Sequence, residues 1–190
     1  MRNNAAMMAK NAKSSNELFN NLKALLNCPT SPSAAYKMGI DMENLIEKIF
    51  HEISLNCQNS SVAKAIDDFI AQAHSNRIYY SDKLTYALNC ELNFFYQSKG
   101  MQIQREEPVL GDSDLYLKTF YNLMERIQER VSLPFYQNTA GIYALAKSLR
   151  NASFELLNHL KLCMPEGSTR QALDEMARRQ HQIQYMQNIH

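Results

Sequence analysis

Three polar side chains in one predicted helix have the types and spacing of a metal site. Glu43, Glu47 and His51 lie four residues apart, so on a helix they project from one face, and carboxylate and imidazole groups bind divalent metals. Ferritin-like helices use Glu-x-x-His and zinc proteases use His-Glu-x-x-His, whereas His51-Glu52 is followed by Ile53-Ser54-Leu55. The three residues also lie opposite the apolar face of their helix, so we expect a solvated acidic surface.

Other candidates for chemistry have plainer explanations. Asp112-Ser113-Asp114 stands at the start of an apolar-periodic segment, where aspartates cap free backbone amides. Glu106-Glu107 is a carboxylate pair in a predicted loop without a phosphate-binding or nucleophile motif beside it. Cys163 follows His159 by four residues but falls in an apolar stripe, which favours an inert core thiol. We predict no catalytic residue, no metal site and no cofactor.

The charge balance argues against nucleic acid as a partner. The formal net charge is +1, so the chain has no overall field to attract a polyanion. The arginine pairs, Arg126 with Arg130 and Arg178 with Arg179, have acidic residues between or beside them, which neutralise them locally. No uninterrupted apolar run approaches the roughly 18 residues that a membrane-spanning helix needs. We predict no nucleic-acid binding and no membrane span.

The cysteines and the first residues indicate a compartment. The 4 cysteines form no Cys-x-x-Cys pair, which argues against zinc-ribbon and thioredoxin-like sites. Residues 1–13 are polar and alanine-rich and lack the apolar stretch of a signal peptide. We expect reduced thiols and a cytoplasmic location, with non-classical secretion as an effector as the alternative.

The composition predicts an all-α fold. The chain has 190 residues, 45% of them hydrophobic and 21% charged, which is typical of one globular domain. Only 5 glycines and 5 prolines leave room for long helices but not for the many tight turns of a sandwich or barrel. We predict a single-domain bundle of about seven helices with short loops. It consists of a polar lead-in at 1–13, the bundle at 14–167 and an amide-rich C-terminal helix at 168–190 whose docking the sequence leaves open.

Apolar residues at helical spacing place the individual helices. The clearest stripe runs through residues 33–55 and consists of Met38, Met42, Leu45, Ile46, Ile49, Phe50 and Ile53. Further helices are predicted at 14–27, 62–76, 81–100, 112–131, 139–163 and 169–190. We expect a break between the third and the fourth because the third is expected to end near Asn76 and Ser81 is a good helix cap. In the segment 112–131, Phe120 and Ile127 are expected to face inward.

Residues 77–97 form the most informative segment. At about 100° per residue, one sector holds four apolar residues and a second sector, about 130° away, holds four others. These are Leu84, Leu88, Leu92 and Phe95, and then Tyr79, Tyr86, Cys90 and Phe94. A surface helix has one apolar stripe, so this helix requires cover on two sides, from its own bundle or from a partner. We expect Leu88 to be buried. Glu91 falls within the first sector and must lie at its boundary or find a basic partner.

These features favour a non-enzymatic module that binds another protein, as a helix or an extended segment. The predicted partner-binding residues are aromatic or apolar and come from this helix, from the loop after it and from the turn before the helix at 139–163: Tyr79, Tyr86, Phe94, Met101, Ile103, Phe135 and Tyr136. One alternative is a small helical enzyme or ligand-binding bundle with an internal polar pocket formed by Glu91, Glu155 and His159. Another is a homo-oligomer formed through the C-terminal tail.

The overall composition, which is glycine-poor, amide-rich and methionine-containing, is similar to that of many small cytoplasmic adaptors and of secreted effectors of intracellular bacteria. This likeness rests on composition and on no specific motif. It implies an adaptor, a chaperone-like protein or an effector with a role in virulence.

Overall fold

The computed structural model describes residues 28–55, 57–98 and 138–187, together with five positions between 118 and 127. These residues form four α-helices and no β-strand. The all-helical prediction is confirmed, but four helices are described rather than the expected total of about seven. Two predicted helices form one continuous helix, and those predicted at 14–27 and 112–131 lie wholly or mostly outside the described residues.

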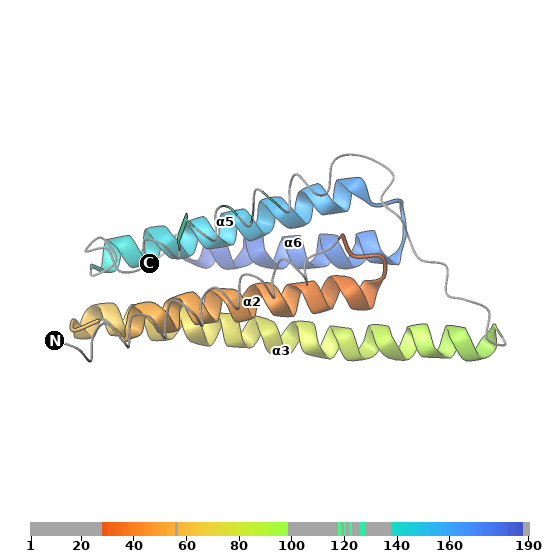
Figure 1. Cartoon of the computed structure of the whole chain (residues 1–190), viewed down its shortest axis with the longest axis horizontal. Coiled ribbons are helices and arrows are strands. Elements are labelled where there is room, and N and C mark those ends of the chain that lie inside the picture. The colour runs from red at the N-terminus through yellow and green to blue at the C-terminus, as the bar shows by residue number, and fades with distance from the viewer. Residues whose placement is uncertain are drawn as a thin grey trace, which may run out of the picture.

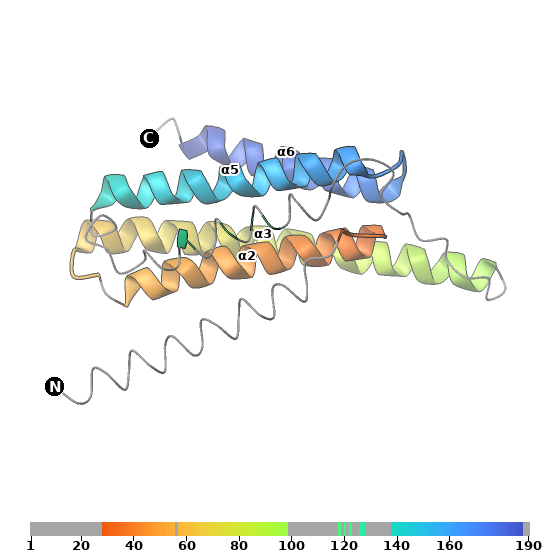
Figure 2. The same ribbon diagram turned by 45° about the horizontal axis from the view of Figure 1, so that its top comes forward.

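The helices pair as two hairpins that lie along the long axis of the molecule (Figures 1 and 2). Helices α2 (Pro32–Ser54) and α3 (Ser60–Gln97) form one hairpin, and α5 (Thr139–Cys163) and α6 (Ser168–Gln187) form the other. The connections at 55–59 and 164–167 are short, which makes each pair antiparallel neighbours. Helix α2 contacts both α3 and α6, and α3 also contacts α5, so the two hairpins pack together as one bundle.

Helix α2 lies within one residue of its predicted range at each end. The Oγ atom of Ser31 accepts a hydrogen bond from the backbone N–H of Ala34 at 3.2 Å and caps the helix. Pro32 occupies the first turn, where its missing N–H leaves no helical bond unmade. All seven apolar residues of the predicted stripe are buried, which confirms this part of the prediction.

Helix α3 runs without interruption through the break that the sequence pattern predicts, so the prediction of two helices is wrong. Asn76 lies in its middle and is buried. The Asn76 amide donates to Glu43 at 3.0 Å and accepts from Arg179 at 2.9 Å. Because residues of other helices satisfy this amide, it does not compete for the backbone groups of its own helix.

Helix α5 occupies the range predicted for it, 139–163, and the Asn138 side chain caps it by accepting from the backbone N–H of Gly141 at 2.8 Å. The apolar residues predicted to face inward are buried, namely Ile142, Leu145, Leu149, Leu156, Leu160 and Cys163. Helix α6 buries four apolar residues, Ala172, Leu173, Met176 and Ala177. The amide-rich helix is therefore packed on the bundle over residues 168–182, where the structure describes its side chains.

Aromatic contacts join the hairpins in a single apolar core. Phe50 of α2 stacks on Phe69 of α3 with 5.2 Å between ring centroids, and Tyr143 of α5 meets Phe69 edge-on at the same distance. Phe120 and Ile127 are buried in this core, as the sequence predicts. None of the described helices has both the length and the apolar character needed to cross a lipid bilayer.

Helix α3 is much longer than its neighbours. At a rise of 1.5 Å per residue, its 38 residues span about 57 Å, whereas the 23 residues of α2 span about 35 Å and the 25 of α5 about 38 Å. The C-terminal end of α3 projects beyond the other three helices in both views (Figures 1 and 2). Ala87 is the last buried residue of α3, and we call residues 88–97 the α3 extension.

Candidate functional site

The α3 extension exposes large apolar side chains on more than one side. Its exposed fractions range from 41% for Phe95 to 74% for Tyr96, and Tyr86, just before the extension, is 71% exposed. The other members of this surface are Leu88, Leu92 and Phe94. Contiguous apolar side chains outside a core are typical of protein interaction sites, whereas single exposed ones are common on any surface. The α3 extension is therefore the candidate functional site.

The residues of the first predicted sector become more exposed towards the C-terminal end of α3. Leu84 is partly buried and packs on the core, but Leu88 is 44% exposed and Leu92 is 51% exposed. The expectation that Leu88 is buried is wrong. Helix α2, which packs along α3, begins at Pro32, and Ser33 of its first turn lies against Glu91. The face beyond Glu91 therefore has no further turn of α2 to cover it.

The structure separates the residues of the second predicted sector. Tyr86 and Phe94 are exposed, whereas Tyr79 is partly buried and packs against the core of this chain. The Tyr79 hydroxyl donates to Glu175, and the Arg179 guanidinium lies 4.0 Å from the centre of its ring. Tyr79 thus belongs to the contact between α3 and α6. The other predicted partner-binding residues, Met101, Ile103, Phe135 and Tyr136, lie outside the described residues.

Glu91 fixes the base of the extension. Its carboxylate accepts from the backbone N–H of Ser33 at 3.0 Å and from the Ser33 hydroxyl at 2.8 Å. Ser33 lies in the first turn of α2, where free N–H groups and the helix dipole favour a negative charge. The sequence required a boundary position or a basic partner for Glu91, and a helix N-terminus serves instead of a basic side chain. This contact sets where α3 leaves α2.

A second carboxylate, that of Glu175, connects α6 with α2 and α3 inside the bundle. Glu175 of α6 accepts from the Tyr36 hydroxyl at 2.7 Å, from the Tyr79 hydroxyl and from Lys83 Nζ at 2.7 Å. Burial alone raises the pKa of Glu175, but the hydrogen bonds from Lys83, Tyr79 and Tyr36 outweigh it and the pKa is lowered. Burial, then the bond to Glu175, raises the pKa of the Tyr36 phenol above its ordinary value. The cluster thus holds a charged carboxylate between neutral phenols.

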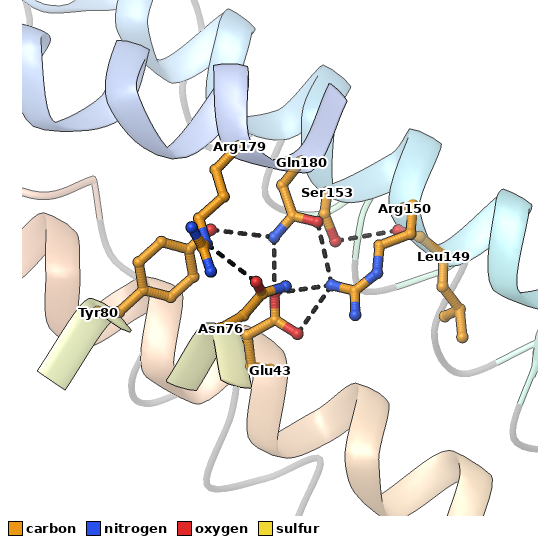
Figure 3. A network of polar contacts seen from close by, with 8 residues as sticks. All are labelled: Glu43, Asn76, Tyr80, Leu149, Arg150, Ser153, Arg179 and Gln180. Atoms are coloured by element: carbon orange, nitrogen blue, oxygen red, sulfur yellow. Dashed lines mark hydrogen bonds and ion pairs between the residues drawn. The ribbon is translucent and has the colours of Figure 1, made fainter. Parts of the chain in front are cut away.

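A buried polar network lies at the centre of the bundle (Figure 3). Arg150 Nη1 donates to the two carboxylate oxygens of Glu43 at 2.7 and 2.8 Å and to Gln180 Oε1 at 3.0 Å. Gln180 Nε2 donates to Glu43 at 2.7 Å and to the Tyr80 hydroxyl at 3.2 Å, and Asn76 adds the bond described above. The network therefore contains residues of all four described helices.

The chemistry of this network is that of a closed cluster around a paired carboxylate. Glu43 and Arg150 carry opposite charges, and both Glu43 oxygens are bound by donors of this chain. Burying a charge is costly unless it is paired and hydrogen-bonded, and both conditions are met here. Because the chain's own donors occupy the carboxylate, the arrangement is suited to fixing four helices relative to one another rather than to binding a ligand.

The sequence pattern places Glu43 wrongly on a solvated surface, since the residue is 0% exposed. A signal for its burial was present in the sequence. Glu43 lies four residues after Gly39 and three before Ile46, and residues at these spacings share one helix face. Both neighbours are buried. Glu47 of the same stripe pairs with Arg77 at 3.3 Å and lies 3.8 Å from His51. Because Arg150 binds Glu43 in the core, the three polar residues of the stripe do not form one group.

The alternative of an internal polar pocket rested on Glu91, Glu155 and His159. Glu91 is held by Ser33 at the start of α2. Glu155 is exposed on α5. These two carboxylates thus face different surroundings, and the structure does not bring them together as the lining of one site.

Comparison of this chain with models of known protein families, with characterised proteins and with solved structures finds no match.

Proposed function

We propose that this chain is a protein-interaction module whose docking surface is the α3 extension, and that its partner is a helix with an apolar stripe. The observation that carries this proposal is the projection of an apolar helical segment beyond the bundle. A helix that is apolar on several sides is normally covered by other elements. Here the three neighbouring helices end before they can supply that cover.

The composition of the surface supports an interface. Phe94, Phe95 and Tyr96 are consecutive residues, so at about 100° per residue they spread aromatic rings over a wide arc of the helix. Aromatic residues are enriched at protein interfaces and supply much of the binding free energy there. Such a surface binds a partner through apolar contact and shape rather than through charge.

The way the extension is attached also supports binding. The continuous hydrogen-bonded helix and the Glu91–Ser33 contact hold the apolar side chains in place before any partner arrives. Preorganisation lowers the conformational entropy lost on association. Because a rigid helix presents side chains along a straight row, the complementary partner is itself a helix, packed at an axis separation of about 8–10 Å.

The proposal is tested with a double variant, Leu92→Asp with Phe95→Asp, in the full chain. A photo-crosslinking residue at position 96 first identifies a partner, which is then purified and titrated against each variant. The two aspartates place charge in the centre of the apolar surface, so the dissociation constant is expected to rise at least tenfold. Thermal unfolding is expected to change little, since Leu92 and Phe95 lie outside the core.

Ile78→Asp is the matched control. Ile78 is 50% exposed, close to the 51% of Leu92, and lies on the same helix within the bundle. Its dissociation constant is expected to stay within about twofold of the wild-type value. Partner binding that is equally strong in the double variant and the wild type would contradict the proposal. A loss of thermal stability as large as that of a core substitution would also contradict it, because the extension would then be part of the fold.

A further inference from the structure

We infer that α6 is a releasable helix, which detaches from the bundle as a unit while α2, α3 and α5 stay folded. This inference goes beyond the proposed function and does not depend on the α3 extension. Proteins open locally in cooperative units, and the free energy of such an opening lies below that of global unfolding. The way in which α6 is attached to the other three described helices favours it as the unit that opens first.

Few large apolar side chains anchor α6. Over residues 168–182, where its side chains are described, the buried residues form one stripe, which consists of Thr169, Ala172, Leu173, Met176, Ala177 and Gln180. Of these, only Leu173 and Met176 are both large and apolar. The buried stripe of α5 contains more such side chains, namely Ile142, Leu145, Leu149, Leu156, Leu157 and Leu160. Because hydrophobic stabilisation grows with the apolar area removed from water, α6 gains less of it than α5.

Polar contacts connect α6 with α2 and α3. Glu175 accepts from two tyrosines and a lysine of these helices. Arg179 Nε donates to Asn76 Oδ1 at 2.9 Å, and Gln180 Nε2 donates to Glu43 at 2.7 Å (Figure 3). When α6 leaves, water replaces each of these partners, so the net contribution of a hydrogen bond is much smaller than its strength in a dry interior. These contacts therefore set the position of α6 on the bundle without preventing its release.

The charged centre of the bundle does not depend on α6. When α6 is released, Arg150 of α5 still binds both carboxylate oxygens of Glu43, and Asn76 of α3 still donates to one of them. Release thus leaves no buried charge without its partner, whereas the loss of α2 or of α5 would separate the pair. The aromatic contacts around Phe69 also join α2, α3 and α5 without any residue of α6. These three helices therefore keep polar and apolar contacts of their own.

Release of α6 uncovers the side of α2 on which it lies. Met176 Sδ fills the space beside Gly39 of α2, where a Cβ atom would lie only 2.7 Å from it. Tyr36 and Glu43 lie one turn to either side of Gly39, and each forms a hydrogen bond with α6. The docked helix thus keeps this side of α2 from water. Its release converts the bundle from this closed form into an open form in which the same side is accessible.

Hydrogen exchange of the full chain, followed by mass spectrometry, tests the inference. The amides of residues 172–182 are expected to share one opening free energy and to exchange about tenfold faster or more than the core amides of α2 and α5, after correction for intrinsic rates. Added urea is expected to accelerate their exchange less steeply, because the release of one helix exposes less surface than global unfolding. Equal exchange in all three helices would overturn the inference. So would an opening of α5 together with α6, or protection in α6 that merely declines towards residue 182.

Two variants test whether α6 opens separately. Phe69→Leu weakens contacts among α2, α3 and α5 that persist in the open form, so it is expected to accelerate exchange in α2 and α5 about fivefold or more and in α6 less than about twofold. Leu173→Ala removes an anchor of α6 itself and destabilises the closed form relative to both the open and the unfolded form. It is therefore expected to accelerate exchange in all three helices about tenfold or more. If Phe69→Leu accelerates exchange in α6 as much as in α2, α6 opens only with the whole bundle and the inference is wrong.

Discussion

Glu43 and Arg150 form an ion pair 2.7 Å long at the centre of the bundle, with exposed side-chain fractions of 0% and 2%. They come from α2 and α5, 107 positions apart in the sequence. Neither side chain of the pair is exposed to water, so dissolved salt screens their attraction little. The contribution of the pair to stability therefore depends on how completely the surrounding hydrogen bonds are made. The pair fixes how the two hairpins are oriented relative to each other. The stability of the fold is therefore sensitive to the loss of either side chain.

Arg150→Met is expected to lower the free energy of unfolding by about 3–5 kcal/mol, because it leaves the Glu43 carboxylate buried without its counter-charge. Urea denaturation followed by circular dichroism measures the change. Adding Glu43→Gln to this variant removes the unpaired charge and keeps an acceptor for Asn76. The double variant is therefore expected to regain about 1–3 kcal/mol. A further loss on adding Glu43→Gln would show that the charge pair is not what the site requires.

The carboxylate of Glu175 predicts a pH dependence of stability. Its pKa is lowered below the ordinary 4.5 in the folded protein, so the folded state holds this proton less tightly than the unfolded state. The associated stability is present above the ordinary pKa and is lost as the pH falls through the folded value. The wild type is expected to lose more stability between about pH 5 and pH 3 than Glu175→Gln does.

Urea denaturation at a series of pH values measures this difference. Asp174, whose pKa is lowered mainly by its hydrogen bond from Lys161, contributes in the same direction but is present in both proteins, so the difference between the two curves isolates Glu175. Tyr36→Phe removes one of the donors to Glu175 and is expected to give an intermediate slope. Parallel curves for the wild type and Glu175→Gln would refute the assignment.

Gly39 lies where α2 packs closely against Tyr80 of α3 and Met176 of α6. A Cβ atom at this position would lie 2.7 Å from Met176 Sδ and 3.1 Å from Tyr80 Cδ2. The overpacking costs about 1–3 kcal/mol and the gain in helix propensity is at most about 1 kcal/mol, so Gly39→Ala is expected to lower the free energy of unfolding by about 1–2 kcal/mol. In a Met176→Ala background, where the sulfur is gone, the same substitution is expected to cost nothing or to stabilise. An equal cost in both backgrounds would exclude the steric explanation.

Two leucines distinguish the bundle from the extension. Leu149 is fully buried on α5, whereas Leu88 is 44% exposed. Leu149→Ala is expected to cost about 2–5 kcal/mol of unfolding free energy, since it creates a cavity, and Leu88→Ala less than about 1 kcal/mol. Thermal and urea unfolding of the two variants and the wild type give the comparison. Equal losses at the two positions would place Leu88 in the core.

Local sequence signals predict a helix correctly where its own residues determine its ends and its buried face. The stripe from Met38 to Ile53 and the range of α5 follow from apolar spacing and from caps such as Ser31 and Asn138, which act within one or two turns. The same signals predicted a break at Asn76, where an asparagine in isolation favours a helix end. Asn76 is accommodated inside a helix because its side chain forms hydrogen bonds with Glu43 and Arg179, which come from two other helices.

The sequence by itself determined that the chain is helical, where α2 and α5 lie, and that the helix around Tyr86 and Phe94 carries more apolar surface than one side of a bundle can cover. The tertiary structure decided which of these surfaces is covered, because cover depends on how long the neighbouring helices are and where they start. It also turned Glu43 from a surface charge into the centre of the core, since a buried carboxylate is tolerated only when donors from distant parts of the chain meet it.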